Sequence, residues 1–279
     1  QLHPDSRVEW LDAGTAVYVT GMALEGNDPK LWLLSRYGGL VEVGTEDKAV
    51  MPVNPQVLTV AGGDVFGLCD DVQTEQTVLF RLEAGAVRIS EWTKIDEEPY
   101  SETQPAEMVY VEPTDELYLL NGRGETTELW YVPNPGDGLE KAMPIHTWNG
   151  VGGEMIAVEK GVMYIEGGPN FLGDAALVRA SAESGLRELG HFKLYADIPV
   201  QLTTDGDRVL LIHADDGTPA VSTVDGGELV PLAMPTTLQS TITVELLKAE
   251  SDGAASWQDL HGPILDVVSE THTISGNGT

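Results

Sequence analysis

A strand-turn-strand pattern that recurs along most of the chain constrains the fold more than any other feature. Two alternating apolar runs flank a tight turn in RVEWLDAGTAVYVTG (residues 7–21), and similar segments follow: QVLTVAGGDVFGLCD, MVYVEPTDELYLLNG, MIAVEKGVMYIEGG and VQLTTDGDRVLLIHAD. Their second strands begin at intervals of 48, 52, 45 and 47 residues, at Val17, Val65, Leu117, Val162 and Val209. Turn centres such as Gly62–Gly63 and Asp205–Gly206 carry residues that tolerate positive φ. A nearly constant period of hairpins predicts a repeat architecture.

A second hairpin follows each of these segments, so each period of about 47 residues holds four expected strands, and helical patterning is nearly absent. Four-stranded units of this length resemble the blades of β-propellers, and the chain is most similar to six-bladed exported propellers of the TolB-like kind. The resemblance implies an all-β fold with one propeller domain over residues 1–279. Five blades are clear and the sixth is degenerate, over residues 7–50, 56–98, 107–146, 154–195, 199–235 and 238–275.

Two β-sandwich domains of about 140 residues each are the alternative fold. A sandwich would also produce short alternating strands with frequent turns.

The charge of the chain limits its partners. Asp and Glu number 45 against 15 Lys and Arg, which gives a formal charge of −30. Nucleic acids and anionic lipid surfaces require clusters of Lys and Arg, and the sequence has none. We therefore expect no nucleic-acid binding, and protein partners that present basic surfaces.

The compartment is predicted from the cysteine content and from the chain start. Cys69 is the single cysteine, which excludes an intrachain disulfide and a Cys-type zinc cluster, and its strand-like surroundings predict a buried thiol. No run approaches the ~20 apolar residues of a membrane span. The sequence starts QLHPDS without Met, so we expect an exported protein, extracellular, periplasmic or associated with the cell envelope, whose signal or anchor was removed.

One short segment carries the candidate metal residues. His213 ends the strand VLLIH and is followed closely by Asp215 and Asp216, so the three could join an acidic cluster at one rim of the ring. A solvated strand end is the simpler interpretation of His213. The spacing of the nearby acidic residues differs from the alternate-position pattern of calcium loops, and Asp-Gly turns already explain several of them, so we expect no cofactor and keep a structural Ca²⁺ as the alternative.

The sequence favours a binding protein over an enzyme, because the linear motifs of serine hydrolases, zinc proteases and nucleotide-binding enzymes are absent. We expect a non-catalytic protein-binding scaffold, or an accessory subunit of a cell-envelope or surface complex. The first alternative is a metal-dependent hydrolase or lactonase-like propeller with a central site drawing on Asp115, Asp207 or Glu166. The second is carbohydrate binding through exposed Trp and Tyr side chains, although inter-blade contacts explain Trp32 and Trp130 better.

Overall fold

The structure is a computed structural model of the chain. It describes residues 9–14, 16–22, 29–35, 39–45, 55–71, 76–89, 91–96, 107–123, 125–168, 172–195, 200–205, 208–232, 239–249 and 265–275. The chain divides into two compact units, Gln1–Leu232 and Ala233–Thr279. None of the described residues belongs to a helix long and apolar enough to cross a membrane. The prediction of an all-β chain is confirmed, since strands account for most of the described residues.

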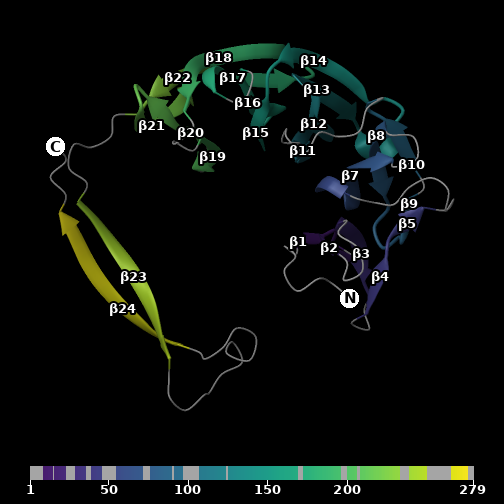
Figure 1. The fold of residues 1–279 in the computed structure, drawn as a ribbon, viewed down its shortest axis with the longest axis horizontal. Coiled ribbons are helices and arrows are strands. Elements are labelled where there is room, and N and C mark those ends of the chain that lie inside the picture. The colour runs from purple at the N-terminus through teal and green to yellow at the C-terminus, as the bar shows by residue number, and fades with distance from the viewer. Residues whose placement is uncertain are drawn as a thin grey trace. The chain divides into compact units, whose positions relative to one another are not determined.

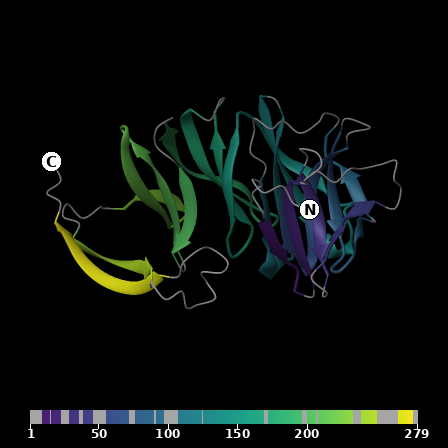
Figure 2. The same cartoon turned by 60° about the horizontal axis from the view of Figure 1, so that its bottom comes forward.

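Five sets of four antiparallel strands make up the first unit (Figures 1 and 2). Sheet I contains β1 (Glu9–Asp12), β2 (Val17–Met22), β3 (Pro29–Leu34) and β4 (Leu40–Glu42). Sheet II contains β6 (Pro55–Ala61), β7 (Asp64–Asp71), β8 (Gln76–Leu82) and β10 (Glu91–Lys94). Two short strands, β5 (Gly44–Thr45) and β9 (Arg88–Ile89), pair in parallel and link sheets I and II.

The remaining three sets follow the same meander. Sheet III contains β11 (Glu107–Val111), β12 (Glu116–Arg123), β13 (Thr126–Pro133) and β14 (Met143–Asn149), with short 3₁₀ turns η1 (Glu112–Thr114) and η2 (Pro135–Asp137). Sheet IV contains β15 (Gly152–Ala157), β16 (Val162–Gly167), β17 (Gly173–Ser181) and β18 (Gly185–Leu194). Sheet V contains β19 (Gln201–Asp205), β20 (Arg208–Asp215), β21 (Thr218–Asp225) and β22 (Glu228–Pro231). A single pair, Lys193 with Ala214, also joins β18 to β20.

Apolar clusters lie between consecutive sheets, so a strand in the middle of the series is buried on both faces. In β12, Leu117 and Leu119 belong to the cluster between sheets II and III, whereas Tyr118 and Leu120 belong to the cluster between sheets III and IV. The near-continuous apolar run LYLL follows from this, because side chains on alternate faces of a strand both meet a neighbouring sheet. The sandwich alternative does not describe this unit, since it would leave one face of each sheet in water.

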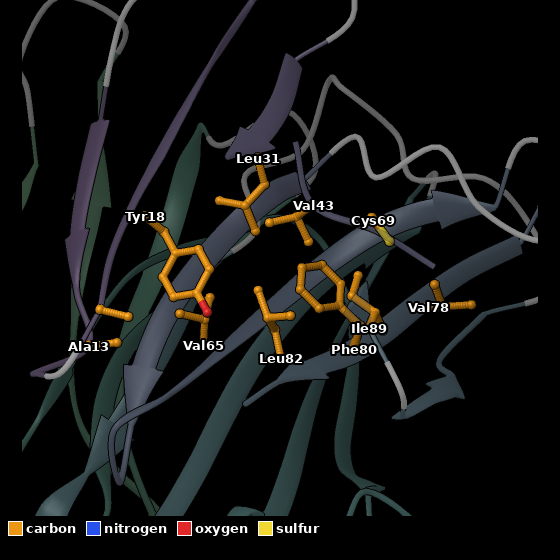
Figure 3. Packing of buried hydrophobic residues seen from close by; sticks show 11 residues of the cluster. Ala13, Tyr18, Leu31, Val43, Val65, Cys69, Val78, Phe80, Leu82 and Ile89 are labelled. Carbon is orange, nitrogen blue, oxygen red and sulfur yellow. The ribbon is translucent and has the colours of Figure 1, made fainter. Parts of the chain in front are cut away.

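The cluster between sheets I and II shows how the layers meet (Figure 3). Tyr18 and Leu31 from sheet I face Val65 and Phe80 from sheet II, and all four are fully buried. The Tyr18 hydroxyl donates to the carbonyl oxygens of Glu83 (3.1 Å) and Ala86 (2.9 Å), so its polar end is satisfied at the edge of the cluster. Cys69 is buried in the same cluster, as the sequence predicts.

Turn chemistry sets the spacing of the strands. Asp216 and Gly217, with φ of 47° and 78°, form the two-residue turn between β20 and β21, which pair from Asp215 with Thr218 onwards. Positive φ at both central residues gives the twist that adjacent antiparallel strands need. Asp216 therefore has a structural explanation in the turn it occupies.

The second unit contains one antiparallel hairpin in its described part. Its strands, β23 (Gln239–Ala249) and β24 (Leu265–Ser275), are 11 residues each and pair along their whole length. These residues fall within the range predicted for a sixth blade, where four shorter strands were expected. Residues 250–264, including the expected hairpin turn of ESDGAASW, lie outside the described residues.

Candidate functional site

The first strands of consecutive sheets lie side by side within the first unit. β1 contacts β6, β6 contacts β11, β11 contacts β15 and β15 contacts β19. The hairpin turns that follow β11, β15 and β19 lie at a common end, because residues at the ends of these three strands line one cavity. This arrangement brings turns that are about 47 residues apart in sequence into one place.

The cavity at this end, called the hairpin cavity, has a volume of about 870 Å³. Cavities of roughly 300–1,000 Å³ are typical of small-ligand sites. Sheets III, IV and V all contribute, and the lining includes Tyr110, Glu112, Val158, Glu159, Met163, Arg179, Thr204, Arg208, Val209 and Val224. The wall is therefore part apolar and part charged, which suits a ligand that has both kinds of surface.

Arg179 is the most unusual side chain of the hairpin cavity. It lies on β17 beside Met163, and its terminal nitrogen Nη2 donates to the carbonyl oxygen of Lys160 at 3.3 Å. Its Nε is buried, and no hydrogen-bond partner for that atom lies within the described part of the chain. A buried N–H without an acceptor costs free energy of folding.

Tyr110 and Asp115 interact at the edge of the same cavity. The Tyr110 hydroxyl donates to Asp115 Oδ1 at 2.9 Å. Burial, and then the hydrogen bond to the Asp115 carboxylate, raise the pKa of Tyr110 to about 12. Asp115 has a φ of 51°, and its N–H donates to the carbonyl oxygen of Glu112. It serves as the cap of η1, which accounts for an acidic residue at this position.

A buried carboxylate fixes the base of this turn. Glu116 accepts hydrogen bonds from three hydroxyls: Thr114 (2.8 Å) and Tyr118 (3.1 Å) at Oε2, and Tyr131 (3.1 Å) at Oε1. Burial is the main reason that the pKa of Tyr131 is raised to about 12, and the Glu116 carboxylate adds to the effect. The pKa of Tyr118 is raised further, for the same reasons. Because these donors come from two strands and a turn, the network holds one side of the cavity in place.

Of the carboxylates considered for a hydrolase, Asp115 lies at the edge of the hairpin cavity, whereas Glu166 is not part of its lining. Glu166 lies four residues beyond the start of β16, about 13 Å along the strand. It pairs instead with His146 Nε2 at 3.1 Å. Asp207 lies outside the described residues. Among the described residues, no three His, Cys, Asp or Glu side chains come close enough to hold a metal ion.

His213 is buried, which corrects the interpretation that it is a solvated strand end. Its Nδ1 donates to the carbonyl oxygen of Ala214 (2.9 Å), and Ser222 Oγ lies 2.8 Å from Nε2. A carbonyl oxygen can only accept, so Nδ1 carries a proton, and Nε2 is hydrogen-bonded to the Ser222 hydroxyl. The ring also contacts Phe192, with centroids 5.5 Å apart. The pairing of β18 with β20 brings β18 over His213 and buries it. The sequence of one strand cannot predict this burial.

His213 and Ser222 line a second, smaller cavity of about 240 Å³ together with Asp215 and Asp216. The two carboxylates are exposed, and the two ring nitrogens of His213 already have partners within the protein. The three metal candidates therefore lie around one cavity, but the ring nitrogens of His213 are hydrogen-bonded to Ser222 and to the backbone.

The structure also pairs two carboxylates that the sequence did not single out. Glu107 on β11 lies near Glu154 on β15, and burial together with the Glu154 charge raises the pKa of Glu107. Glu154 Oε2 accepts the N–H of Leu202 on β19. Glu107 and Glu154 lie on separate strands, each without another acidic residue nearby in its strand. Only the contact between β11 and β15 brings the two carboxylates together.

Trp32 and Trp130 are buried, at 6% and 9% exposure, so neither is an exposed platform for a sugar. Trp130 lies in the cluster between sheets II and III, as inter-blade contact predicts, and its Nε1 donates to Glu128 Oε2 at 2.9 Å. The carbohydrate-binding alternative therefore loses Trp32 and Trp130 as exposed platforms.

Comparisons with known proteins give only distant structural similarities. No protein-family model matches the chain, and no curated protein matches it in sequence. The chain is similar to TolB from Acinetobacter baumannii, with a TM-score of 0.45 and 11% identity over 81% of this chain and 55% of that one. Oligopeptidase B from Leishmania major gives a TM-score of 0.48 and 16% identity, over 82% and 34%. An engineered GH43 glycoside hydrolase gives 0.31 and 10%, over 98% and 56%. The chain thus spans between 34% and 56% of the length of these proteins.

Proposed function

We propose that the chain is a non-catalytic, protein-binding scaffold or accessory subunit of a cell-envelope or surface complex, and that it binds at the hairpin end of its sheets. The hairpin cavity is the observation that carries the proposal. It joins the turns of three consecutive sheets into one recess of about 870 Å³. Stacked sheets hold these turns in fixed positions, and loops on a rigid scaffold often carry the residues that bind a partner.

The charge of the chain supports a partner with basic patches. A formal charge of −30 attracts cationic surfaces at long range, and Glu112 and Glu159 place carboxylates on the lining of the hairpin cavity. Association through exposed charges weakens as salt rises, because the Debye length shortens from about 10 Å at 0.1 M to about 3 Å at 1 M.

The proposal includes the finer features of the architecture and compartment. In it, the chain forms one six-bladed propeller, with residues 238–275 contributing to the sixth blade, and the protein is exported. The repeat of about 47 residues and the contacts between successive first strands support the blade assignment.

The test is affinity capture from a cell-envelope extract at about 0.05 M and about 0.5 M salt. The bait is the wild-type chain or the double variant Glu112→Gln/Glu159→Gln. The matched control is Glu125→Gln, an exposed carboxylate in the turn at the other end of β12. We expect a protein captured by the wild type and the control at low salt that is depleted by the double variant and by high salt. Equal capture by all three baits at both salt concentrations would contradict the proposal.

A further inference from the structure

Two side chains of β14 meet two side chains of β16 where sheets III and IV face each other. His146 Nε2 lies 3.1 Å from Glu166 Oε2, and the two residues belong to different sheets. Trp148, two residues along β14, packs against Tyr164 on β16 with ring centroids 5.6 Å apart. Residues two apart on a strand share a face, so both pairs lie in the interface between the two sheets. We call this group of four side chains the III–IV clasp.

His146 lies between a carboxylate and an aromatic face, and both favour the charged form of its ring. The imidazole stacks on Trp148, with centroids 5.3 Å apart and planes at 21°. Trp148 is buried in the cluster between sheets III and IV, so packing fixes the face that it presents. An imidazolium gains an ion pair with the carboxylate and a cation–π contact with the indole, whereas the neutral ring keeps only its hydrogen bond and its stacking contact. Protonation of His146 therefore strengthens both of its contacts in the clasp.

The partial exposure of the His146–Glu166 pair allows it to respond to pH. The two side chains are 28% and 27% exposed, so water can exchange protons with the imidazole, while the pair is screened less than one at the open surface. A second His–Glu pair offers a comparison. His191 Nε2 lies 2.8 Å from Glu188 Oε1, but both residues are on β18 and are 68% and 55% exposed. That pair lies within one strand and joins no two sheets.

The other titratable side chains of this interface leave Glu166 as the charge that acts most directly on His146. Burial, and then the Glu166 charge, raise the pKa of Tyr164, so its hydroxyl stays neutral. The strand registers place five more titratable side chains on the faces that neighbouring strands turn to the interface: Tyr131 on β13, Asp174 on β17, and Glu188, His191 and Lys193 on β18. Burial and its hydrogen bond to a carboxylate also keep Tyr131 neutral. Glu188 pairs with His191, and the register places Asp174 opposite Lys193, so acidic and basic side chains of this set offset each other.

We propose that the III–IV clasp is a pH-sensitive contact that holds sheets III and IV together more firmly when His146 is protonated. An imidazole ordinarily changes its charge at about pH 6.5, where carboxylates are already ionised. The added stability is therefore present at about pH 5.5 and is lost as pH rises to about 8. Sheets III and IV both line the hairpin cavity, so the clasp acts on a junction across which the cavity is built. This property goes beyond the proposed protein-binding function and is independent of what the cavity binds.

The test is a double-mutant cycle in thermal unfolding of the full chain, at about pH 5.5 and at about pH 8. The four proteins are the wild type, His146→Gln, Glu166→Gln and the double variant. A cycle is required because a chain of formal charge −30 gains stability on acidification from weaker self-repulsion, whatever His146 does. We expect the two substitutions to be coupled by about 1–3 °C in melting temperature at the lower pH, and by at most about half of that at the higher pH.

The exposed pair on β18 supplies the matched control. A cycle of His191→Gln with Glu188→Gln should show a coupling below about 1 °C at both pH values, because that pair is solvated and joins no two sheets. If the double variant of the clasp does not fold, the loss of melting temperature in His146→Gln alone is compared at the two pH values, and we expect the larger loss at the lower pH.

Two results would overturn the proposal. The first is a coupling between His146 and Glu166 that is equal at both pH values or larger at the higher one. The second is a loss of melting temperature in His146→Gln at the lower pH that is no greater than the loss in His191→Gln.

Discussion

Leu119 and Leu120 are consecutive residues of β12 that test the stacked-sheet architecture. Both are fully buried, but Leu119 belongs to the cluster between sheets II and III, and Leu120 to the cluster between sheets III and IV. Truncation of a buried leucine to alanine costs about 2–5 kcal/mol, from lost transfer energy and from the cavity left behind. We therefore expect Leu119→Ala and Leu120→Ala each to lower the free energy of unfolding by an amount in this range.

The assay is urea denaturation followed by tryptophan fluorescence, with Leu186→Ala as the control. Leu186 lies on β18 and is 40% exposed, so its truncation should cost about 0.5 kcal/mol or less. A strand with one face in water would show a large effect at one of the two adjacent positions and a small effect at the other. Such alternation would refute burial on both faces and support the sandwich alternative.

Three further substitutions test the contacts around the site. Glu116→Ala should destabilise the fold by about 2 kcal/mol or more, because buried hydroxyls lose their acceptor. It should also lower the pKa of Tyr131 from about 12, as measured by an alkaline absorbance titration. An unchanged pKa of Tyr131 would contradict the role given to the Glu116 carboxylate. Thr127 Oγ1 donates to the Gly150 carbonyl (2.7 Å) and accepts the Gly152 N–H (3.0 Å). Thr127→Val should therefore lower the free energy of unfolding by about 1–3 kcal/mol in the same urea assay. An unchanged free energy of unfolding would count against this link between sheets III and IV. The pKa of Glu107 is raised in the folded state, so the stability that Glu107 contributes is fully present below its ordinary pKa of about 4.3 and is lost as pH rises through the higher folded value. Glu107→Gln should therefore raise the melting temperature at about pH 7 more than at about pH 4. An equal shift at both pH values would show that Glu107 does not titrate in this way.

The repeat could be predicted from the sequence because each strand carries its own local signal. Turn residues such as Gly62 and Gly161, which adopt positive φ, mark where strands reverse, and the apolar run in β12 marks burial on both faces. The hairpin of β23 and β24 departs from the expected short strands. Its turn signals are blurred in sequence, so little in the residues fixes where each strand ends.

The candidate site could be predicted only in part, because it depends on contacts between sheets. Arg179 stands in the strand ALVRAS, where nothing indicates that it lines a cavity with Arg208. His213 ends an apolar strand beside two aspartates, which favours exposure, yet the neighbouring sheet buries it against Phe192. In both cases the residue that determines the environment lies on a different sheet. The pattern of apolar and polar residues within one strand cannot predict such a contact.

Hydrogen–deuterium exchange of the chain with and without its captured partner tests most directly whether the hairpin cavity is the binding site. We expect the partner to slow exchange in the peptides that contain Glu112 and Glu159, because both residues line the cavity. Slower exchange elsewhere on the first unit, with these two peptides unchanged, would contradict the account.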